Sequence, residues 1–201
     1  IRATKNNFGK IVRKLASPSS AALFLQNRYF PSHLWSKYIK QCSSVKKTVF
    51  ILSFDCDTEL DIEVLPQVVA KLRSIGIKPV LAVPGELIEK GKVVYKELAI
   101  AGIEFINHGY VQHTQLELPQ RIYRSSFFYH KLSKNQITQD IDKGHEVIYK
   151  LIGTRPTGFR TPHFGSFQKN SQLKFLWKIL QDRGYEFSTS TIPGIGIRKG
   201  P

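Results

Sequence analysis

Apolar positions along the chain alternate between short continuous runs and longer stretches in which they recur every three or four residues. The short runs are typical of buried strands, and the periodic stretches are typical of amphipathic helices. The expected strands are residues 49–54, 79–83, 103–106, 158–159 and 185–189, and the expected helices are residues 62–75, 86–101, 134–152 and 171–183. A glycine directly follows each of the four helices, as is common where a helix ends. Residues 115–132 follow neither pattern and predict a long irregular connection.

This alternation of strand and helix predicts parallel βα units, so the expected fold class is α/β. With 201 residues, 41% of them hydrophobic, the chain is long enough to bury a core of its own. Its two cysteines are too few for a disulfide framework. No apolar run reaches the roughly 18 residues of a membrane span. The pattern predicts one globular domain, residues 48–201, preceded by residues 1–47.

Residues 1–47 differ from the rest of the chain in charge, because they hold ten Lys or Arg and no acidic residue, two thirds of the net charge of +15. Apolar and aromatic residues recur at helical spacing on either side of Pro31, which predicts a basic helical arm. Three interpretations stay open. The arm packs on the domain with a solvated basic face, or it contacts an anionic membrane surface or an acidic glycan. Nucleic acid is the least favoured partner, because no recognition motif accompanies the charge.

Chemically reactive side chains follow three of the expected strands. They are Asp55 and Asp57 after the first, His108 and His113 after the third, and Arg160 and His163 after the fourth. The carboxyl ends of parallel strands are where α/β folds build their sites. An aspartate with two histidines is a suitable donor set for Zn²⁺ or a similar divalent ion, with positions left open for water and substrate. The alternatives are that the acids cap the next helix and that each histidine is structural. Cys56, between the two aspartates, is interpreted as a small apolar filler and not as a nucleophile.

Three segments carry a resemblance to a known family. Ser53-Phe-Asp-Cys-Asp57, Asn107-His-Gly-Tyr-Val-Gln-His-Thr114 and Gly158-Phe-Arg-Thr-Pro-His-Phe-Gly165 follow one another in the order of the first three motifs of the polysaccharide deacetylases, carbohydrate esterase family four. The chain resembles this family over roughly residues 48 to 190. The resemblance implies an irregular (β/α)₇ barrel, incomplete at its C-terminus or compact. It also implies a metal-dependent hydrolase that removes N-acetyl groups from an oligo- or polysaccharide containing amino sugars.

The resemblance also implies a role for each motif residue. Asp55 corresponds to the general base, Asp57, His108 and His113 to the metal ligands, Arg160 to the residue that orients the base, and the Pro162–His163 turn to the source of a backbone N–H for the oxyanion. The expected metal is zinc, or cobalt in its place. The expected partner is an N-acetylated carbohydrate.

Two features depart from the family's pattern. The family usually spaces its two histidines four residues apart, whereas His108 and His113 are five apart. An α-helix would place them roughly 140° apart and a strand would place them on opposite faces, so a widened, π-like turn at Gly109 is expected. Otherwise Glu59, His163 or a water takes the place of His113. The second departure is that the family's late histidine, its general acid, has no counterpart after His163, so the chain is expected to be a fragment or a member that has lost or replaced the acid.

Three functional hypotheses follow. The leading one is the metal hydrolase, the second is a catalytically silent relative that binds a glycan or an anionic surface, and the third is an unrelated basic α/β binding protein. The histidine spacing and the missing acid favour the silent form over an active enzyme. The sequence does not decide between a cytoplasmic and a cell-envelope location.

Overall fold

The computed structural model describes Ser36 and residues 50–191. In chain order its elements are β1 (Ser53–Asp55), α4 (Glu59–Ser74), β2 (Val80–Val83), α5 (Gly85–Lys90), α6 (Lys92–Ile100), β3 (Glu104–Asn107), β4 (Thr114–Glu117), β5 (Ile122–Ser125), the 3₁₀ helix η1 (Tyr129–Lys131), α7 (Lys134–Ile152), β6 (Gly158–Phe159), the 3₁₀ helix η2 (Phe164–Ser166), α8 (Asn170–Asp182) and β7 (Phe187–Ser188). The predictions for residues 1–47, including the domain boundary at residue 48, lie outside the described residues apart from Ser36 and stay predictions.

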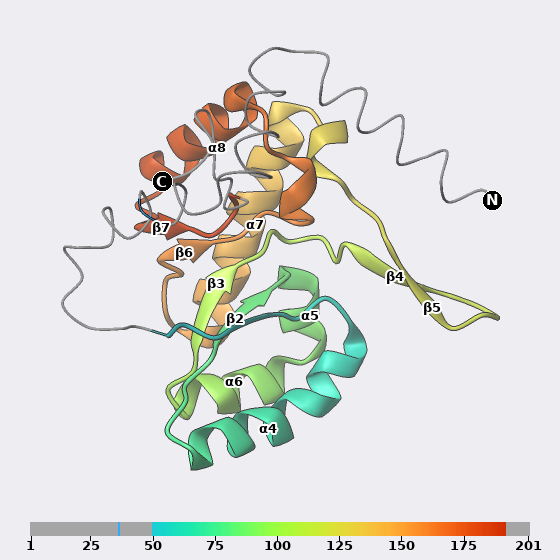
Figure 1. Cartoon of the computed structure of the whole chain (residues 1–201), viewed down its shortest axis with the longest axis vertical. Helices are drawn as coiled ribbons and strands as arrows, with labels where there is room; N and C mark the ends of the chain where they lie inside the picture. The colour runs from blue at the N-terminus through green and yellow to red at the C-terminus, as the bar shows by residue number, and fades with distance from the viewer. Residues whose placement is uncertain (1–35, 37–49, 192–201) are drawn as a thin grey trace. The chain divides into compact units, whose positions relative to one another are not determined.

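Five strands form one parallel sheet in the order β1-β2-β3-β6-β7 (Figure 1). The register aligns Asp55 with Ala82, Val83 with Asn107, and Asn107 with Phe159, so the ends of these strands lie level. The strands of this sheet lie side by side in the order in which they occur in the sequence, and helices connect them. This is the arrangement of a (β/α) barrel. Among the described residues β1 and β7 are the edges of this sheet. The α/β class with a parallel sheet is therefore confirmed.

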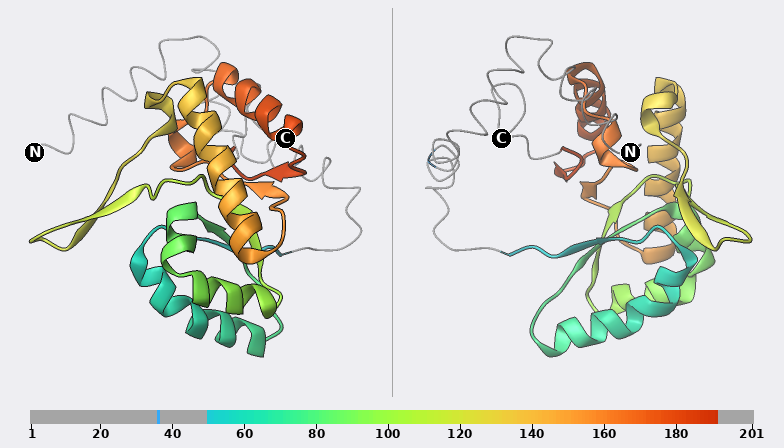
Figure 2. Two further views of the ribbon diagram at one scale, coloured as in Figure 1. Left: turned by 180° about the vertical axis from the view of Figure 1, so that it is seen from behind. Right: turned by 45° about the vertical axis from the view of Figure 1, so that its right-hand side comes forward.

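Two hydrophobic clusters hold the helices to the sheet. One joins α4, α5 and α6 to β2 and β3, with Leu81 and Ile88 fully buried. The other lies around α8 and β6 and includes Phe159 and Leu180. Helix α7 contributes Val147 and Ile148 to the first cluster and Ile137 and Ile141 to the second. Figure 2 shows this long helix lying along the sheet, where it packs against β3, α5 and α6. Helix α7 is therefore the common support of both halves of the core.

Local signals in the sequence account for the ends of the best predicted helix. Ser133 caps α7, since its side chain accepts a hydrogen bond from the Gln136 N–H while Gln136 reaches back to the Ser133 N–H. Gly153 ends the helix in the left-handed conformation, with φ of +88°. Both ends agree with the predicted residues 134–152.

Three sequence predictions about the elements were wrong. Residues 86–101 form two helices because the chain turns at Gly91, where an added Cβ would lie 2.8 Å from the Ile62 side chain. Residues 115–132 are not irregular throughout. They include most of the β4–β5 hairpin, which Figure 1 shows projecting away from the sheet. Most of its residues are exposed on both faces, so no alternation of apolar and polar residues marked it. The outer strands β1 and β7 are also shorter than predicted.

No helix within residues 50–191 is both long enough and apolar enough to cross a lipid bilayer.

Candidate active site

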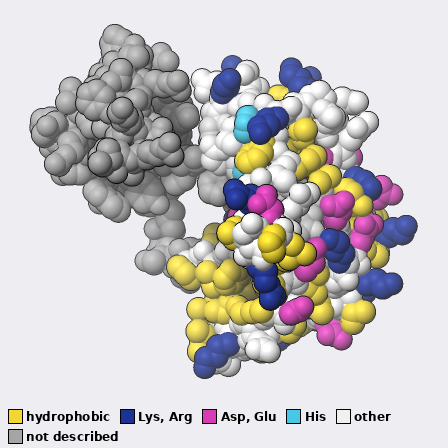
Figure 3. Space-filling model, turned by 90° about the vertical axis from the view of Figure 1, so that its right-hand side faces the viewer, with side chains coloured by type: hydrophobic (Ala, Val, Ile, Leu, Met, Phe, Trp, Pro, Cys, Tyr) yellow, Lys and Arg dark blue, Asp and Glu magenta, His cyan; other side chains and the backbone are white. Residues whose placement is uncertain are grey.

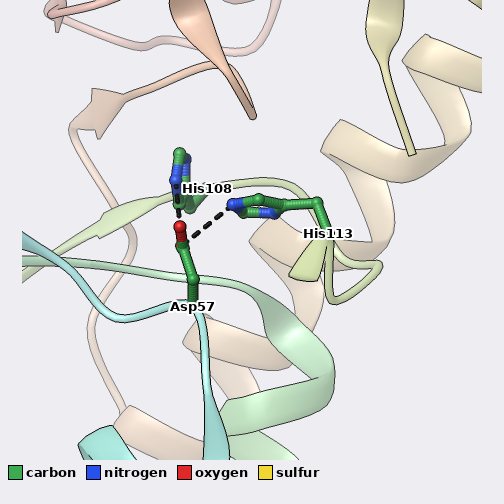
Figure 4. A group of neighbouring side chains, drawn as sticks. All are labelled: Asp57, His108 and His113. Carbon is green, nitrogen blue, oxygen red and sulfur yellow. Dashed lines mark ion pairs between the residues drawn. The ribbon is translucent and has the colours of Figure 1, made fainter. Parts of the chain in front are cut away.

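Three side chains from two loops meet beyond the carboxyl ends of β1 and β3. Asp57 lies two residues after β1, His108 directly follows β3, and His113 directly precedes β4. Their side chains point toward one another (Figure 4). Asp57 Oδ1 lies 2.9 Å from His113 Nε2 and 3.5 Å from His108 Nε2, and one donor atom from each residue lies within 4.8 Å of the other two. The structure thus brings together the aspartate and the two histidines that the sequence singled out.

Asp57 does not cap α4, which was the alternative interpretation. The cap is made by Thr58 and Asp61, since Asp61 accepts hydrogen bonds of 2.8 Å from both the N–H and the hydroxyl of Thr58. The Asp57 carboxylate is therefore free to face the histidines. Burial by itself raises the pKa of the Asp57 carboxyl, but its contacts with His108 and His113 outweigh burial and hold that pKa well below its usual range.

The donor atoms of this cluster are better placed to bind a cation than to form hydrogen bonds with one another. Asp57 Oδ1 and both ring nitrogens of His113 are buried, and none of them has an aligned hydrogen-bond partner among residues 50–191. Polar atoms buried in this way are costly unless a partner satisfies them. His108 Nδ1 lies 2.7 Å from the Arg160 carbonyl oxygen and donates its N–H there, which leaves the Nε2 lone pair directed at Asp57. A histidine that binds a metal through one ring nitrogen typically donates a hydrogen bond from its other ring nitrogen to a carbonyl or carboxylate. The residues present therefore fit a divalent metal ion.

The five-residue spacing is accommodated by a loop and not by the predicted π-like turn. Residues 108–113 form neither a helix nor a strand. Gly109 has φ of +81°, a conformation that other residues rarely adopt, so this loop requires glycine at that position. The loop lets the His113 ring return beside the His108 ring, with 4.5 Å between the two ring centroids.

Helix α7 holds this loop in place through a buried carboxylate that the sequence analysis missed. Asp140 accepts hydrogen bonds from the Val111 N–H at 2.9 Å and from the Tyr129 hydroxyl at 2.6 Å. Burial raises the pKa of the Asp140 carboxyl, although both donors act against that increase. At Gly144, one turn further along α7, an added Cβ would lie 2.6 Å from the Gly109 carbonyl oxygen, so the loop backbone rests directly on the helix. One signal in the sequence could have identified Asp140: it is an acidic residue on the apolar face of the predicted helix, between Ile137 and Ile141.

Asn107, also missed, anchors the start of the same loop. Its side-chain oxygen accepts the Gly109 N–H at 2.9 Å, and its amide donates to the Ile141 carbonyl at 2.9 Å and to the Tyr185 hydroxyl at 2.6 Å. All of these groups are buried together, which fixes the backbone between the two histidines.

Arg160, which directly follows β6, holds the second aspartate of the site. Its guanidinium forms an ion pair with Asp55 through Nη1, and it donates to the Ser53 hydroxyl through Nη2 and to the Thr189 hydroxyl through Nε, each of the latter at 2.8 Å. A guanidinium fixed at three points presents its partner in one orientation. This is the pairing that the resemblance implied.

His163 lies beside the cluster but is not part of it. Its Nε2 is 3.0 Å from the His113 carbonyl oxygen and 2.9 Å from that of Ser126, and its ring contacts the rings of His113 and Phe128. It follows the buried Pro162 and has φ of +47°, which turns the chain sharply there. Glu59, another alternative ligand, instead pairs with Lys90 at 2.6 Å. Neither residue takes the place of His113, and the contribution of a backbone N–H from this turn stays a prediction.

A cavity of about 410 Å³ opens at this site. It is lined by Asp55, Asp57, His108, Ser125, Phe128, His163, Gly165 and Ser166. Cys56 faces away from it, in the hydrophobic core, and burial raises the pKa of its thiol, which agrees with its interpretation as a filler.

Replacing Asp140 with alanine is expected to destabilise the fold and to weaken metal binding. The change leaves the Val111 N–H and the Tyr129 hydroxyl without an acceptor in a buried place, at a cost of about 1–3 kcal/mol for each donor. Urea unfolding measures the first effect and metal titration the second. The matched control is Asp142→Ala on the same helix, which removes an exposed ion pair with Arg183 worth no more than about 1 kcal/mol. Equal stability of the two variants would contradict the anchoring role of Asp140.

Fold and site together define an α/β protein with an Asp-His-His cluster and an arginine-held aspartate at the carboxyl edge of a parallel sheet. The family model described as polysaccharide deacetylase matches residues 43–188. The chain belongs to this family, and the resemblance seen in the sequence is confirmed. No curated protein matches the chain.

Solved structures with a similar fold include active and inactive members of carbohydrate esterase family 4. A pseudoenzyme of this family from Bacillus anthracis is 20% identical with a TM-score of 0.54, over 71% of this chain and 43% of that chain. A mutant of that pseudoenzyme with restored activity is 21% identical with a TM-score of 0.55, over 72% and 45%. The peptidoglycan N-acetylglucosamine deacetylase Bc1960 is 25% identical with a TM-score of 0.51, over 69% and 54%. The chain thus spans about half the length of the structures that it matches.

Proposed function

We propose that the protein is a metal-dependent hydrolase that removes N-acetyl groups from amino sugars in an oligo- or polysaccharide. The observation that carries the proposal is the convergence of Asp57 Oδ1 with the Nε2 atoms of His108 and His113. Of these three atoms, Asp57 Oδ1 and His113 Nε2 are buried without an aligned hydrogen bond. A divalent ion, zinc or cobalt, held by these three residues would supply Lewis-acid chemistry, lowering the pKa of a water and polarising an acyl carbonyl.

In this proposal Asp55 acts as the general base. It lines the same cavity as Asp57 and His108, so it faces the space that an acyl group would occupy. Asp55 accepts the proton of the attacking water and passes it to the sugar nitrogen as the bond between that nitrogen and the acyl carbon breaks, which gives acetate and a free amino sugar. The guanidinium of Arg160 forms an ion pair with Asp55 and fixes the direction of its carboxylate.

The oxyanion that forms on the acyl oxygen needs a donor as well. The Pro162–His163 turn is the proposed source of a backbone N–H, since His163 lines the cavity and its ring is held by two carbonyl oxygens. Removing one such donor typically costs about 3 kcal/mol of transition-state stabilisation.

The choice of an N-acetylated sugar as substrate rests on the family and on the deacetylase of similar fold that acts on N-acetylglucosamine in peptidoglycan. Of the two alternatives, a silent relative is supported by the pseudoenzyme among the similar structures. The five-residue histidine spacing no longer favours it, because both histidines reach Asp57. Binding of residues 1–47 to an anionic membrane surface or an acidic glycan remains a separate prediction.

The test combines metal content with turnover. Purified protein is expected to retain zinc or cobalt in stoichiometric amount and to release acetate from N-acetylglucosamine oligomers. Chelation should stop acetate release, and added metal should restore it. Metal without acetate release would favour the silent relative, and absence of both would favour an unrelated binding protein.

A further inference from the structure

The loop between the two histidines of the proposed metal site is one residue longer than the family's usual spacing allows. Its four residues are Gly109, Tyr110, Val111 and Gln112. Every added residue brings backbone freedom that must be restricted before His113 can stay beside Asp57. The side chains of Asn107 and Asp140 hold the first and third of these residues. The residue directly before His113 needs a contact of its own.

The start of helix α5 supplies that contact. The Gly85 N–H donates to the Gly109 carbonyl oxygen at 3.0 Å, and the Glu86 N–H donates to the Tyr110 carbonyl oxygen at 2.9 Å. The Glu86 carboxylate in turn accepts the Gln112 N–H through Oε2, at 2.6 Å. Glu86 therefore holds the backbone of the loop at two points, once through its own backbone and once through its side chain.

The Tyr110 side chain fixes the same part of the loop against both helices. Its ring packs on Gly85, where an added Cβ would lie 2.7 Å from Tyr110 Cδ2. Lys143 of α7 places its Nζ 3.5 Å from the centroid of this ring, and the Tyr110 hydroxyl donates to Glu89 of α5 at 3.0 Å. The loop is thereby kept in place along α5, so that the Gln112 N–H stays opposite the Glu86 carboxylate.

Glu86 differs from the surface acids around it. On the side of the molecule from which the hairpin projects, Asp and Glu side chains are interspersed with Lys and Arg (Figure 3). An exposed pair of this kind, such as Glu59 with Lys90 at 2.6 Å, contributes little to stability. Glu86 is half-buried and forms no ion pair within residues 50–191. Its partner is a backbone N–H, and a hydrogen bond of this type to a carboxylate is comparatively strong.

The constraint on Gln112 acts directly on His113, because the two residues are adjacent. On the other side of His113, its carbonyl oxygen accepts the Ser126 N–H at 2.7 Å, and the Thr114 hydroxyl donates to the Asp57 carbonyl oxygen. The backbone at His113 is thus held from both directions, with its Nε2 at 2.9 Å from Asp57 Oδ1. Without the Glu86 carboxylate, only the second of these holds would remain.

We propose that Glu86 is a positioning residue of the metal site, which keeps His113 directed at Asp57 (Figure 4). Glu86 is not itself one of the ligands, since the group of donor atoms found within residues 50–191 consists of Asp57, His108 and His113. It does not line the catalytic cavity either. The inference rests on the metal site of the proposed function and adds to it a residue that maintains its geometry. Metal affinity then depends on the hydrogen bond that Glu86 accepts and not on its charge.

The test separates that hydrogen bond from the charge. Glu86→Gln removes the charge but keeps an oxygen that can accept the Gln112 N–H, whereas Glu86→Ala removes both. The matched control is Glu97→Ala, which changes an exposed glutamate on α6. Zinc affinity is measured by calorimetry on the full chain, and the absorption spectrum of the cobalt-loaded protein reports the coordination of the metal. Urea unfolding measures stability, and NMR measures hydrogen exchange of the Gln112 amide in metal-free protein.

Glu86→Ala is expected to weaken zinc binding by about 10-fold, at the lower end of what residues supporting metal ligands contribute, and to change the cobalt spectrum. Glu86→Gln and Glu97→Ala should stay within about 2-fold of the wild-type affinity, with an unchanged spectrum. In metal-free protein the Gln112 amide should exchange faster in Glu86→Ala alone.

Wild-type zinc affinity and cobalt spectrum in Glu86→Ala would overturn the positioning role while leaving the metal site in place. Equal weakening in Glu86→Gln and Glu86→Ala would assign the effect to charge and would overturn it as well. So would a loss of affinity that follows a loss of stability and leaves the cobalt spectrum unchanged, since Glu86 would then be merely structural. If the wild-type protein binds neither metal, the proposed function fails, and exchange of the Gln112 amide still decides whether Glu86 holds the loop.

Discussion

Replacing Asp57 with alanine is expected to abolish stoichiometric binding of zinc or cobalt while residues 50–191 remain folded. Asp57 Oδ1 is the atom on which both histidine Nε2 atoms converge, and its carboxylate is the only charged member of the proposed ligand set. Two imidazoles alone are fewer ligands than the three that catalytic zinc sites use. The fold should persist because Asp57 takes no part in capping α4, which Thr58 and Asp61 provide.

Metal content of the dialysed variant measures this effect, and circular dichroism verifies the fold. His108→Ala should behave in the same way, with the added loss of the hydrogen bond to the Arg160 carbonyl. Asp142→Ala is the control, since Asp142 is an exposed aspartate on α7 outside the site. Full metal occupancy in a folded Asp57→Ala or His108→Ala protein would show that the metal is held elsewhere.

Replacing Asp55 with asparagine is expected to leave metal binding intact and to lower the deacetylation rate by about 10²–10⁴-fold. The amide keeps the shape of the carboxylate, and its oxygen still accepts a hydrogen bond from Arg160. It cannot accept the proton of the attacking water, so the base is lost while the ligand set of Asp57, His108 and His113 remains. Acetate release from N-acetylglucosamine oligomers and metal content, measured on the same sample, separate the two effects.

Asp57→Asn is the matched comparison for that experiment, because it makes the same chemical change two residues along the chain. It should lose metal and activity together. If Asp55→Asn loses the metal and Asp57→Asn keeps it, the roles of the two aspartates must be exchanged.

Much of the fold could be predicted because its signals are local. Helix 134–152 has a capping serine before it, a glycine after it and an apolar face along its length, and the structure reproduces both of its ends. The reactive residues could be expected at one edge of the sheet because parallel strands end at a common edge, which made Asp57, His108 and Arg160 candidates. The hairpin could not be predicted in this way, since its exposed strands lack the apolar alternation by which a half-buried strand is recognised.

The sequence by itself therefore determined the order of the strands of the parallel sheet, the family, and the candidate residues of the site. Only the tertiary structure decided whether histidines five residues apart could reach one carboxylate. The reason is that the path of the loop depends on two residues of α7 that are distant in sequence. Asp140 accepts a hydrogen bond from the Val111 N–H, and Gly144, which has no side chain, leaves room for the backbone of Gly109. Periodicity along a chain describes neighbours one or two turns away, whereas these contacts exist only once α7 has packed against β3.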